Sequence, residues 1–272
     1  MMAKKNSFEC GDALQLLPAL EAESVHLTIT SPPYDSLRVY GGHPFGLEEV
    51  AALAAELWRV TVDGGVCCWV VQDQIRQGSH TLTSFKHALE FQRAGWNLHN
   101  TLVIQKPVIR GTSRTRYGVA PEFVFVFSKG SPRVVNLLQD KPNKYAGKWM
   151  KVSNRDRDGF LSEIRKVLIR EYGVRGNIWR VATGGKSTTT YSRAYQHPAL
   201  MPEVLARDLV LSWSNPLDLV LDPLAGAGTT AVAALLSDRY YLGFEVHEPY
   251  HRLALERLEK AHAEYRKMLE EE

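Results

Sequence analysis

Short apolar runs alternate along this chain with segments in which apolar residues recur every three or four positions. The apolar runs predict strands at residues 25–30, 66–72, 98–105, 122–127, 217–222 and 241–245. The longer period predicts helices at residues 47–62, 81–94, 201–212, 229–236 and 249–268. Strands separated by helices predict an α/β fold, with a parallel sheet and helices on both of its faces.

Between residues 107 and 195 this regular pattern loosens. Glycine, serine, threonine, arginine and lysine dominate there, and the pattern predicts one helix at residues 161–172 and a mobile loop at 183–192. We therefore divide the chain into residues 1–106 and 196–272, which form the two parts of the sheet domain, and an insertion at 107–195.

Charge is distributed unevenly over the 272 residues. Residues 106–193 hold 19 lysines and arginines against 6 acidic residues, whereas the rest of the chain holds 14 basic and 24 acidic residues. A basic segment in an acidic remainder indicates that one part of the protein meets a polyphosphate such as a nucleic acid. The alternative is a set of solvated surface faces.

The three cysteines give neither a disulfide framework nor a metal-binding pair, and no apolar run is long enough to span a bilayer. These features predict a cytoplasmic protein without membrane association and without a metal site.

One glycine-containing turn, DPLAGAGTT, follows a predicted buried strand and precedes a helix. Gly226 and Gly228 let the backbone approach a ligand closely, and the helix N-terminus adds N–H donors. Glu245 ends the next strand, 19 residues after Gly226, at the separation where an acid binds ribose hydroxyls. Because Ala231 replaces the third glycine of the dinucleotide fingerprint, a nicotinamide site and a merely structural turn both stay open.

A second segment, TSPPY, follows the predicted strand at residues 25–30. A carbonyl held by the two prolines and the Ser31 hydroxyl are rigid acceptors, which suit chemistry at an aromatic amino group. By accepting hydrogen bonds from the N–H groups of the amino nitrogen, they would polarise these N–H bonds and make the nitrogen lone pair available for reaction. Tyr34 offers a face on which a flipped base could stack. The alternative is a turn stiffened by prolines, with an incidental tyrosine.

Together these segments resemble the DNA amino-methyltransferases that act on adenine N6 or cytosine N4. TSPPY resembles their (D/N/S)PP(Y/F) signature, DPLAGAGTT is similar to their adenosylmethionine motif, and the catalytic-first order matches the β group of the family. The resemblance covers about two thirds of the chain. It implies a Rossmann-like, S-adenosylmethionine-dependent methyltransferase sheet in circularly permuted motif order, with an inserted basic target-recognition region.

The resemblance also implies roles for individual residues and for the three parts of the chain. Residues 1–106 become the catalytic half, 107–195 the target-recognition region and 196–272 the cofactor-binding half. The implied catalytic residues are Ser31, Pro32, Pro33 and Tyr34. The implied S-adenosylmethionine-binding residues are Asp12, Ala13, Thr30, His197, Pro198, Asp222, Pro223, Leu224, Ala225, Gly226, Gly228, Thr229, Thr230 and Glu245.

Seven basic residues of the insertion are the candidates for binding DNA: Arg110, Arg114, Arg116, Lys141, Lys144, Lys148 and Lys151. The three arginines are expected in a loop just beyond a sheet strand. The four lysines recur every three or four positions, a spacing that suits either one face of a helix or a loop.

The expected activity is sequence-specific methylation of double-stranded DNA at the amino group of a flipped base, with adenine N6 and cytosine N4 equally open. Alternatives are an RNA or protein-amide methyltransferase of the same fold, an inactive DNA-binding module, and a nicotinamide oxidoreductase. The resemblance also implies a homodimer. The chain shows no nuclease motif, so any restriction activity would need a separate endonuclease as partner.

Overall fold

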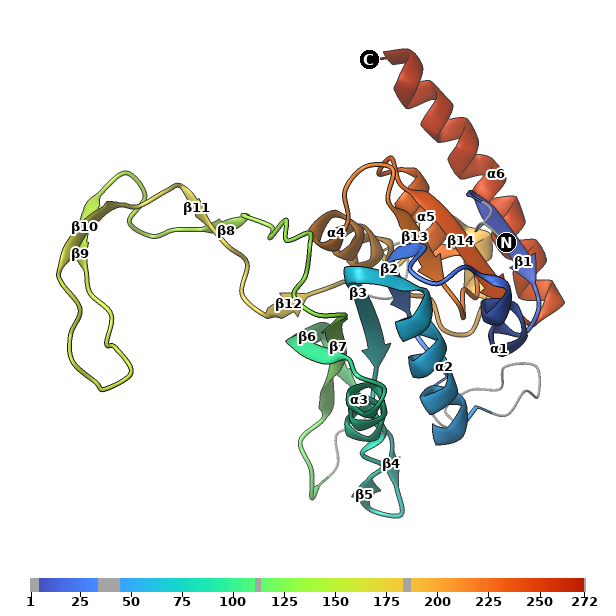
Figure 1. The fold of residues 1–272 in the computed structure, drawn as a ribbon, viewed down its shortest axis with the longest axis horizontal. Helices are drawn as coiled ribbons and strands as arrows, with labels where there is room; N and C mark the ends of the chain where they lie inside the picture. Colours follow the sequence, from blue (N-terminus) through green and yellow to red (C-terminus); the bar gives the residue numbers. More distant parts are fainter. Residues whose placement is uncertain (1–4, 34–44, 111–113, 183–186, 272) are drawn as a thin grey trace. The chain divides into compact units, whose positions relative to one another are not determined.

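The computed structural model describes residues 5–33, 45–110, 114–182 and 187–271. The chain divides into two compact units, one of residues 1–136 and 178–272 and the other of residues 137–177, which we call the arm. Figure 1 shows the larger unit as a sheet flanked by helices, and the arm as a set of short paired strands.

The larger unit is built on an eight-stranded sheet in the order β1-β14-β13-β2-β3-β7-β6-β12. The strands in that order are β1 (Ser7–Cys10), β14 (Tyr240–Glu245), β13 (Leu219–Asp222), β2 (Val25–Thr30), β3 (Thr61–Val71), β7 (Val119–Ser128), β6 (Asn97–Arg110) and β12 (Ile178–Arg180). The expected α/β fold is confirmed. The expectation of an all-parallel sheet is wrong at β7, which runs antiparallel to β3 and to β6. Only eight residues join β6 to β7, too few for the crossover that parallel neighbours require.

Helices cover both faces of this sheet. In one layer α2 (Leu47–Val60) contacts both α1 (Ala13–Leu16) and α3 (Thr83–Arg93), and α4 (Glu203–Trp213), α5 (Thr229–Leu235) and α6 (Glu248–Glu271) form the other. Alternate residues of a strand face opposite sides. Trp69 accordingly packs in one core cluster with Leu57 and Phe91, while Cys68 is buried on the opposite face of β3.

The helix expected at residues 47–62 ends at Val60, and the glycines after it do not form its C-terminus as predicted. Gly64 instead lies in an irregular part of β3, with its backbone N–H donating to the Lys129 carbonyl and its carbonyl accepting from the Arg133 N–H. Its φ of +72° favours glycine, and an added Cβ would lie 2.9 Å from the Ser131 carbonyl oxygen. Gly64 therefore serves the pairing of β3 with residues 129–133, which follow β7, rather than the helix end.

The helix expected at residues 161–172 is absent, and that prediction was wrong. β10 (Arg165–Leu168) pairs with β9 (Trp149–Val152), and β11 (Tyr172–Gly173) pairs with β8 (Lys141–Pro142). Leu161 and Ile164 are each 65% exposed. An amphipathic helix needs a core against which to bury its apolar face, and the arm offers none, so the backbone pairs with β9 instead.

The remaining elements are short: η1 (Leu17–Ala19), the hairpin of β4 (Ile75–Arg76) and β5 (Ser79–His80), and η3 (Ser192–Gln196). Of the loop expected at 183–192, residues 183–186 lie outside the described residues, and Thr188 and Thr189 are buried. Over the described part of the chain, no helix has the length and apolarity needed to cross a membrane.

Candidate active and cofactor site

The carboxyl ends of four neighbouring parallel strands meet at one edge of the sheet. β1 ends at Cys10, β14 at Glu245, β13 at Asp222 and β2 at Thr30. Cys10 lies opposite Glu245 in the register of β1 and β14. This edge of an open α/β sheet is where ligands bind. TSPPY and DPLAGAGTT, which the sequence separates by almost two hundred residues, therefore begin side by side, at the ends of the paired strands β2 and β13.

A buried hydrogen bond joins the two motifs directly. The Thr30 hydroxyl donates to Asp222 Oδ1 at 2.7 Å, and the Leu224 N–H donates to the same oxygen at 3.2 Å. Burial raises the pKa of Asp222 to about 6, against the opposing effect of hydrogen bonds from Thr30, Thr230 and Leu224. A carboxyl group that titrates near neutrality thus lies between the two strand ends.

Glu245 fixes the conformation of the glycine turn. Its Oε2 accepts a hydrogen bond from the Gly226 N–H at 2.8 Å, and its Oε1 accepts one from the His247 N–H at 2.8 Å. Burial raises the pKa of Glu245, and the two N–H donors oppose that shift. Since a carboxylate has about four acceptor positions, Glu245 keeps capacity for hydroxyl donors of a ligand.

An imidazole closes over the glycine turn. A Cβ added at Gly226, whose φ is +52°, would lie 2.8 Å from His197 Nε2. The His197 ring lies edge-on to Tyr250 at 4.4 Å, and Tyr250 contacts the His247 ring at the same centroid distance. His247 Nδ1 is buried and has no hydrogen-bond partner among the described residues. Sequence reasoning missed Tyr250 and His247, and their closeness to Glu245 was the one signal available for finding them.

The other residues predicted for the cofactor lie around the same edge. The Asp12 carboxylate is exposed and accepts from the Leu14 N–H at 2.9 Å, which makes it the N-cap of α1. The Thr230 hydroxyl donates to the Ile29 carbonyl at 3.3 Å. The buried residues of this predicted set are Ala13, Pro223, Ala225, Gly228, Thr229 and Thr230, and the half-buried ones are Pro198 and Leu224.

The predicted catalytic segment follows Thr30 at this edge. Pro32 is buried, and Ser31 and Pro33 are half-buried. Tyr34, which was predicted to stack on the base, lies outside the described residues.

The basic residues predicted for DNA lie in two regions. Arg110 belongs to strand β6, paired with Val119, so the prediction of a loop position is wrong for it. Arg114 is exposed, and the guanidinium of Arg116 donates to the Gly78 carbonyl.

The four lysines lie in the arm, exposed on β8, on β9 and on the turn between them, rather than along a helix: Lys141, Lys144, Lys148 and Lys151. The ammonium groups of Lys144 and Lys148 lie 5.6 and 5.9 Å from the centre of the Tyr145 ring.

Comparison with known proteins identifies the family. The chain is 47% identical over 238 residues to the orphan methyltransferase M.BamHII of Bacillus amyloliquefaciens, which covers 86% of this chain and 89% of the relative. Among solved structures, the cytosine-N4-specific PvuII DNA methyltransferase matches with a TM-score of 0.69 and 19% identity, over 100% of this chain and 95% of that one. The M1.HpyAVI–SAM complex matches with a TM-score of 0.58 and 19% identity, over 93% and 98%. Residues 25–256 match the DNA methylase family model, and the chain therefore belongs to the N6-adenine and N4-cytosine DNA methyltransferase family.

Proposed function

We propose that this enzyme transfers a methyl group from S-adenosylmethionine to the exocyclic amino group of a flipped base in double-stranded DNA. The observation that carries the proposal is the hydrogen bond from Thr30 to Asp222. It links the segment that bears Ser31 to the glycine turn at one sheet edge, so a bound cofactor and an inserted base would meet there.

The donors and acceptors around the turn fit S-adenosylmethionine. Glu245 has acceptor capacity for ribose hydroxyls, and Gly226 leaves no space between its backbone and His197 for a side chain, so the turn is shaped by backbone alone. A cationic ligand would favour the charged form of the Asp222 carboxyl group, whose pKa burial raises. When bound, the cofactor supplies an electrophilic methyl group on a sulfonium. The M1.HpyAVI–SAM complex, with the same fold, supports this choice.

The chemistry at the base falls to the segment after Thr30. In adenine and cytosine the amino nitrogen shares its lone pair with the ring. The Ser31 oxygen and a carbonyl of the Pro32–Pro33 pair would each accept a hydrogen bond from one N–H of the amino group. These two hydrogen bonds would direct the nitrogen lone pair out of the ring plane. The nitrogen would form a bond to the methyl carbon as the carbon–sulfur bond breaks, which would leave S-adenosylhomocysteine, and one N–H proton would pass along one of these two hydrogen bonds to solvent. Tyr34 would hold the flipped base by stacking.

We assign DNA binding chiefly to the arm. Residues 137–177 hold ten basic and five acidic residues. In the ribbon of β9 and β10, Lys151 lies directly opposite Lys166, and Trp149 lies opposite Leu168. Like charges opposite each other destabilise a ribbon unless an anion lies between or above them. A two-stranded ribbon also fits the DNA major groove, and phosphates would neutralise both lysines.

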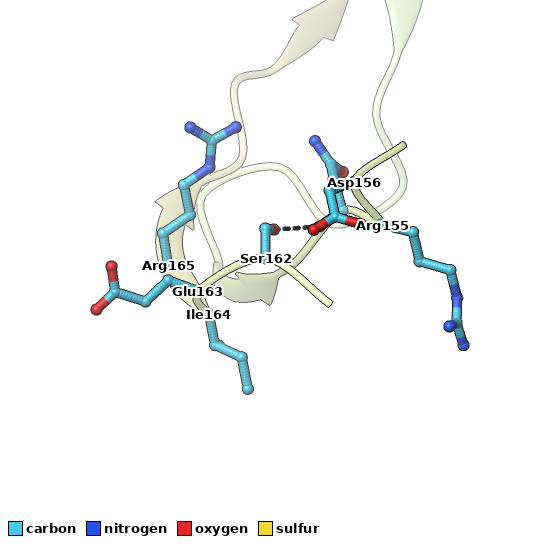
Figure 2. A pocket seen from close by; sticks show the side chains of 7 residues that line it. Arg155, Asp156, Ser162, Glu163, Ile164 and Arg165 are labelled. Carbon is cyan, nitrogen blue, oxygen red and sulfur yellow. Dashed lines mark hydrogen bonds between the residues drawn. The ribbon is translucent and has the colours of Figure 1, made fainter. Parts of the chain in front are cut away.

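The tip of this hairpin has a different character. A hollow of about 670 Å³ is lined by Asn154, Arg155, Asp156, Ser162, Glu163, Ile164 and Arg165. In Figure 2 the side chains of Arg155 and Arg165 extend away from each other on opposite sides of it. Two carboxylates balance these two guanidinium groups, so the net positive charge of the arm lies outside the hollow.

The test is mass spectrometry of nucleosides from DNA incubated with the enzyme and methyl-labelled S-adenosylmethionine. We expect labelled N6-methyladenine or N4-methylcytosine, and which of the two appears identifies the base. DNA that carries neither product would contradict the proposal, and faster labelling of an RNA of the same sequence would favour the RNA alternative.

Ser31→Ala should lower the rate constant of transfer while leaving cofactor affinity nearly unchanged, because Ser31 is assigned to the base. The matched control is Ser24→Ala, just before the start of β2, where the hydroxyl donates to the Glu21 carbonyl. We also propose that the enzyme acts as a homodimer, and a monomer mass by light scattering of its DNA complex would contradict this.

A further inference from the structure

An ion pair between a buried arginine and a half-buried glutamate lies next to the glycine turn, outside the residues assigned so far. The Arg257 side chain of α6 is 3% exposed. Its Nη1 donates to the Ala227 carbonyl at 3.0 Å and to the Thr229 hydroxyl at 2.9 Å, and its Nη2 donates to Glu203 Oε1 at 2.6 Å. One guanidinium group therefore holds the glycine turn, the first turn of α5 and the start of α4 together.

Glu203, the first residue of α4, extends this network to a different part of the chain. Its Oε1 also accepts from the Thr189 hydroxyl at 2.5 Å, and its Oε2 accepts from the Thr190 N–H at 3.1 Å. The Glu203 N–H donates to the Thr188 carbonyl at 3.0 Å. Residues 188–190 lie near the end of the inserted region, after β12 and seven to nine residues before His197. Glu203 thus anchors the last part of the inserted region, after β12 has rejoined the sheet by pairing with β6.

Stability alone does not account for this arrangement. Removing two charges from water costs more than their attraction commonly returns, and apolar side chains of similar volume often stabilise a protein as well. Burial alone would raise the pKa of Glu203, but the hydrogen bonds from Thr189, Thr190 and Arg257 hold that pKa below its ordinary value. What the pair supplies, and apolar packing does not, is a fixed relative position of three segments, because the planar guanidinium directs its donors rigidly.

We propose that Glu203 and Arg257 are positioning residues that couple the glycine turn to residues 188–190, so that cofactor binding and DNA binding strengthen each other. This inference rests on the proposed function. A ligand that settles the turn fixes the Ala227 carbonyl and the Thr229 hydroxyl. Arg257 and Glu203 then fix Thr189 and Thr190, and with them the last residues of the inserted region. Because the two binding equilibria are thermodynamically linked, bound DNA must raise the affinity for the cofactor by the same factor by which the cofactor raises the affinity for DNA.

The test is a binding cycle with two ligands. The dissociation constant of a duplex that carries the methylated site is measured by fluorescence anisotropy, with and without saturating S-adenosylhomocysteine. That of S-adenosylhomocysteine is measured by calorimetry with and without the duplex. For the unaltered enzyme we expect each ligand to tighten the other by roughly tenfold, within the usual range of such couplings.

Thr189→Val tests the link, because it removes the hydroxyl bond to Glu203, together with the bond that this hydroxyl accepts from the Tyr191 N–H, and leaves every contact of Arg257 with the turn in place. We expect the coupling to fall to roughly twofold or less, while the affinity for S-adenosylhomocysteine in the absence of DNA stays close to that of the unaltered enzyme. The matched control is Thr190→Val, at an exposed threonine whose hydroxyl lies 3.4 Å from Glu203 Oε2 and whose backbone N–H bond is retained. This variant should keep the coupling.

Arg257→Lys keeps the charge but loses the planar fork, so it should weaken both cofactor binding and the coupling. Thermal melting of each variant shows whether it is folded. If the Arg257→Lys variant does not fold, Thr189→Val still tests the inference. An unaltered enzyme that binds both ligands independently would overturn the inference, as would a Thr189→Val variant with full coupling. An enzyme that binds no S-adenosylhomocysteine would instead refute the proposed function.

Discussion

The sheet edge and the arm differ in how their residues are brought together. At the edge, Thr30 and Asp222 are 192 positions apart, and both are at most 5% exposed. In the arm, pairing joins residues within about thirty positions, and Trp149 and Phe160 are 68% and 72% exposed. The edge therefore depends on the whole fold for its geometry, whereas the arm depends on local pairing and leaves its side chains available to a partner.

The two regions also use charge differently. At the edge, burial raises the pKa of Asp222 and of Glu245, so the surroundings determine the protonation of a few carboxyl groups. The arm instead exposes many cations, and its Asp140 has a lowered pKa because Arg175 forms a hydrogen bond with it. Desolvated carboxyl groups suit a small cationic ligand held closely, and a field of exposed cations suits a polyanion.

The largest expected effect tests the buried character of the edge through pH. The folded state holds the proton of Asp222 more tightly than the unfolded state, since its pKa is about 6 rather than 3.8. The free-energy cost that ionising Asp222 adds to the folded state is thus absent below about pH 4. This cost grows between about pH 4 and pH 6 and is constant at higher pH. It amounts to about 3 kcal/mol. Asp222→Asn removes this cost, so the free energy of unfolding of the unaltered enzyme, relative to this variant, should fall by that amount between pH 4 and 7.

Urea denaturation across this pH range measures the difference, and a difference independent of pH would contradict the burial of this carboxyl group. Asp140→Asn in the arm is the control. Because the Asp140 side chain is half-exposed, its pair with Arg175 is largely screened, and its effect should stay below about 1 kcal/mol.

The second effect tests whether the glycine turn is as closely packed as the edge requires. Gly226→Ala would place a Cβ 2.8 Å from His197 Nε2 at a positive φ, so the turn must move. We expect cofactor affinity to fall by about 2 kcal/mol, roughly 30-fold, by calorimetry. Gly130→Ala is the matched control, because its φ is also positive, at +73°, but nothing lies within 4 Å of the added carbon. Equal losses of affinity in both variants would show that backbone strain, and not the contact with His197, is responsible.

The smallest effect concerns the arm. Replacing both Lys151 and Lys166 with glutamine should weaken DNA binding by about 1 kcal/mol, roughly fivefold. It should also reduce the slope of log affinity against log salt by about one to two, because up to two phosphate contacts are lost. Lys86→Gln, at an exposed position of α3, should change neither quantity. A salt slope that stays the same in the double variant would place the DNA contacts elsewhere.

The sequence predicted the sheet edge better than the arm. The strands ending at Thr30, Asp222 and Glu245 were predicted nearly to the residue, because buried parallel strands read as continuous apolar runs with glycine or proline at their ends. The helix predicted at 161–172 failed because helical spacing stabilises a helix only where its apolar face is covered, and coverage is not written in the local sequence.

Arg257 illustrates the same limit within a correctly predicted helix. It shares the buried face of α6 with Leu253, Ala254, Leu258 and Ala261, and an arginine at such a position was a signal available in the sequence. Its partner could not be read there, because Glu203 precedes it by 54 positions. Only packing of α4 against α5 and of α5 against α6 brings the two together.

By itself, then, the sequence determined the family, the two motifs, the strands that end in them and the basic character of the insertion, since these follow from residue type and local order. The tertiary structure alone decided which residues touch. It paired Thr30 with Asp222, reversed β7, turned the arm into ribbons and buried Arg257 against Glu203. These outcomes depend on which surfaces exclude water together, and that is a property of the folded chain rather than of any one segment.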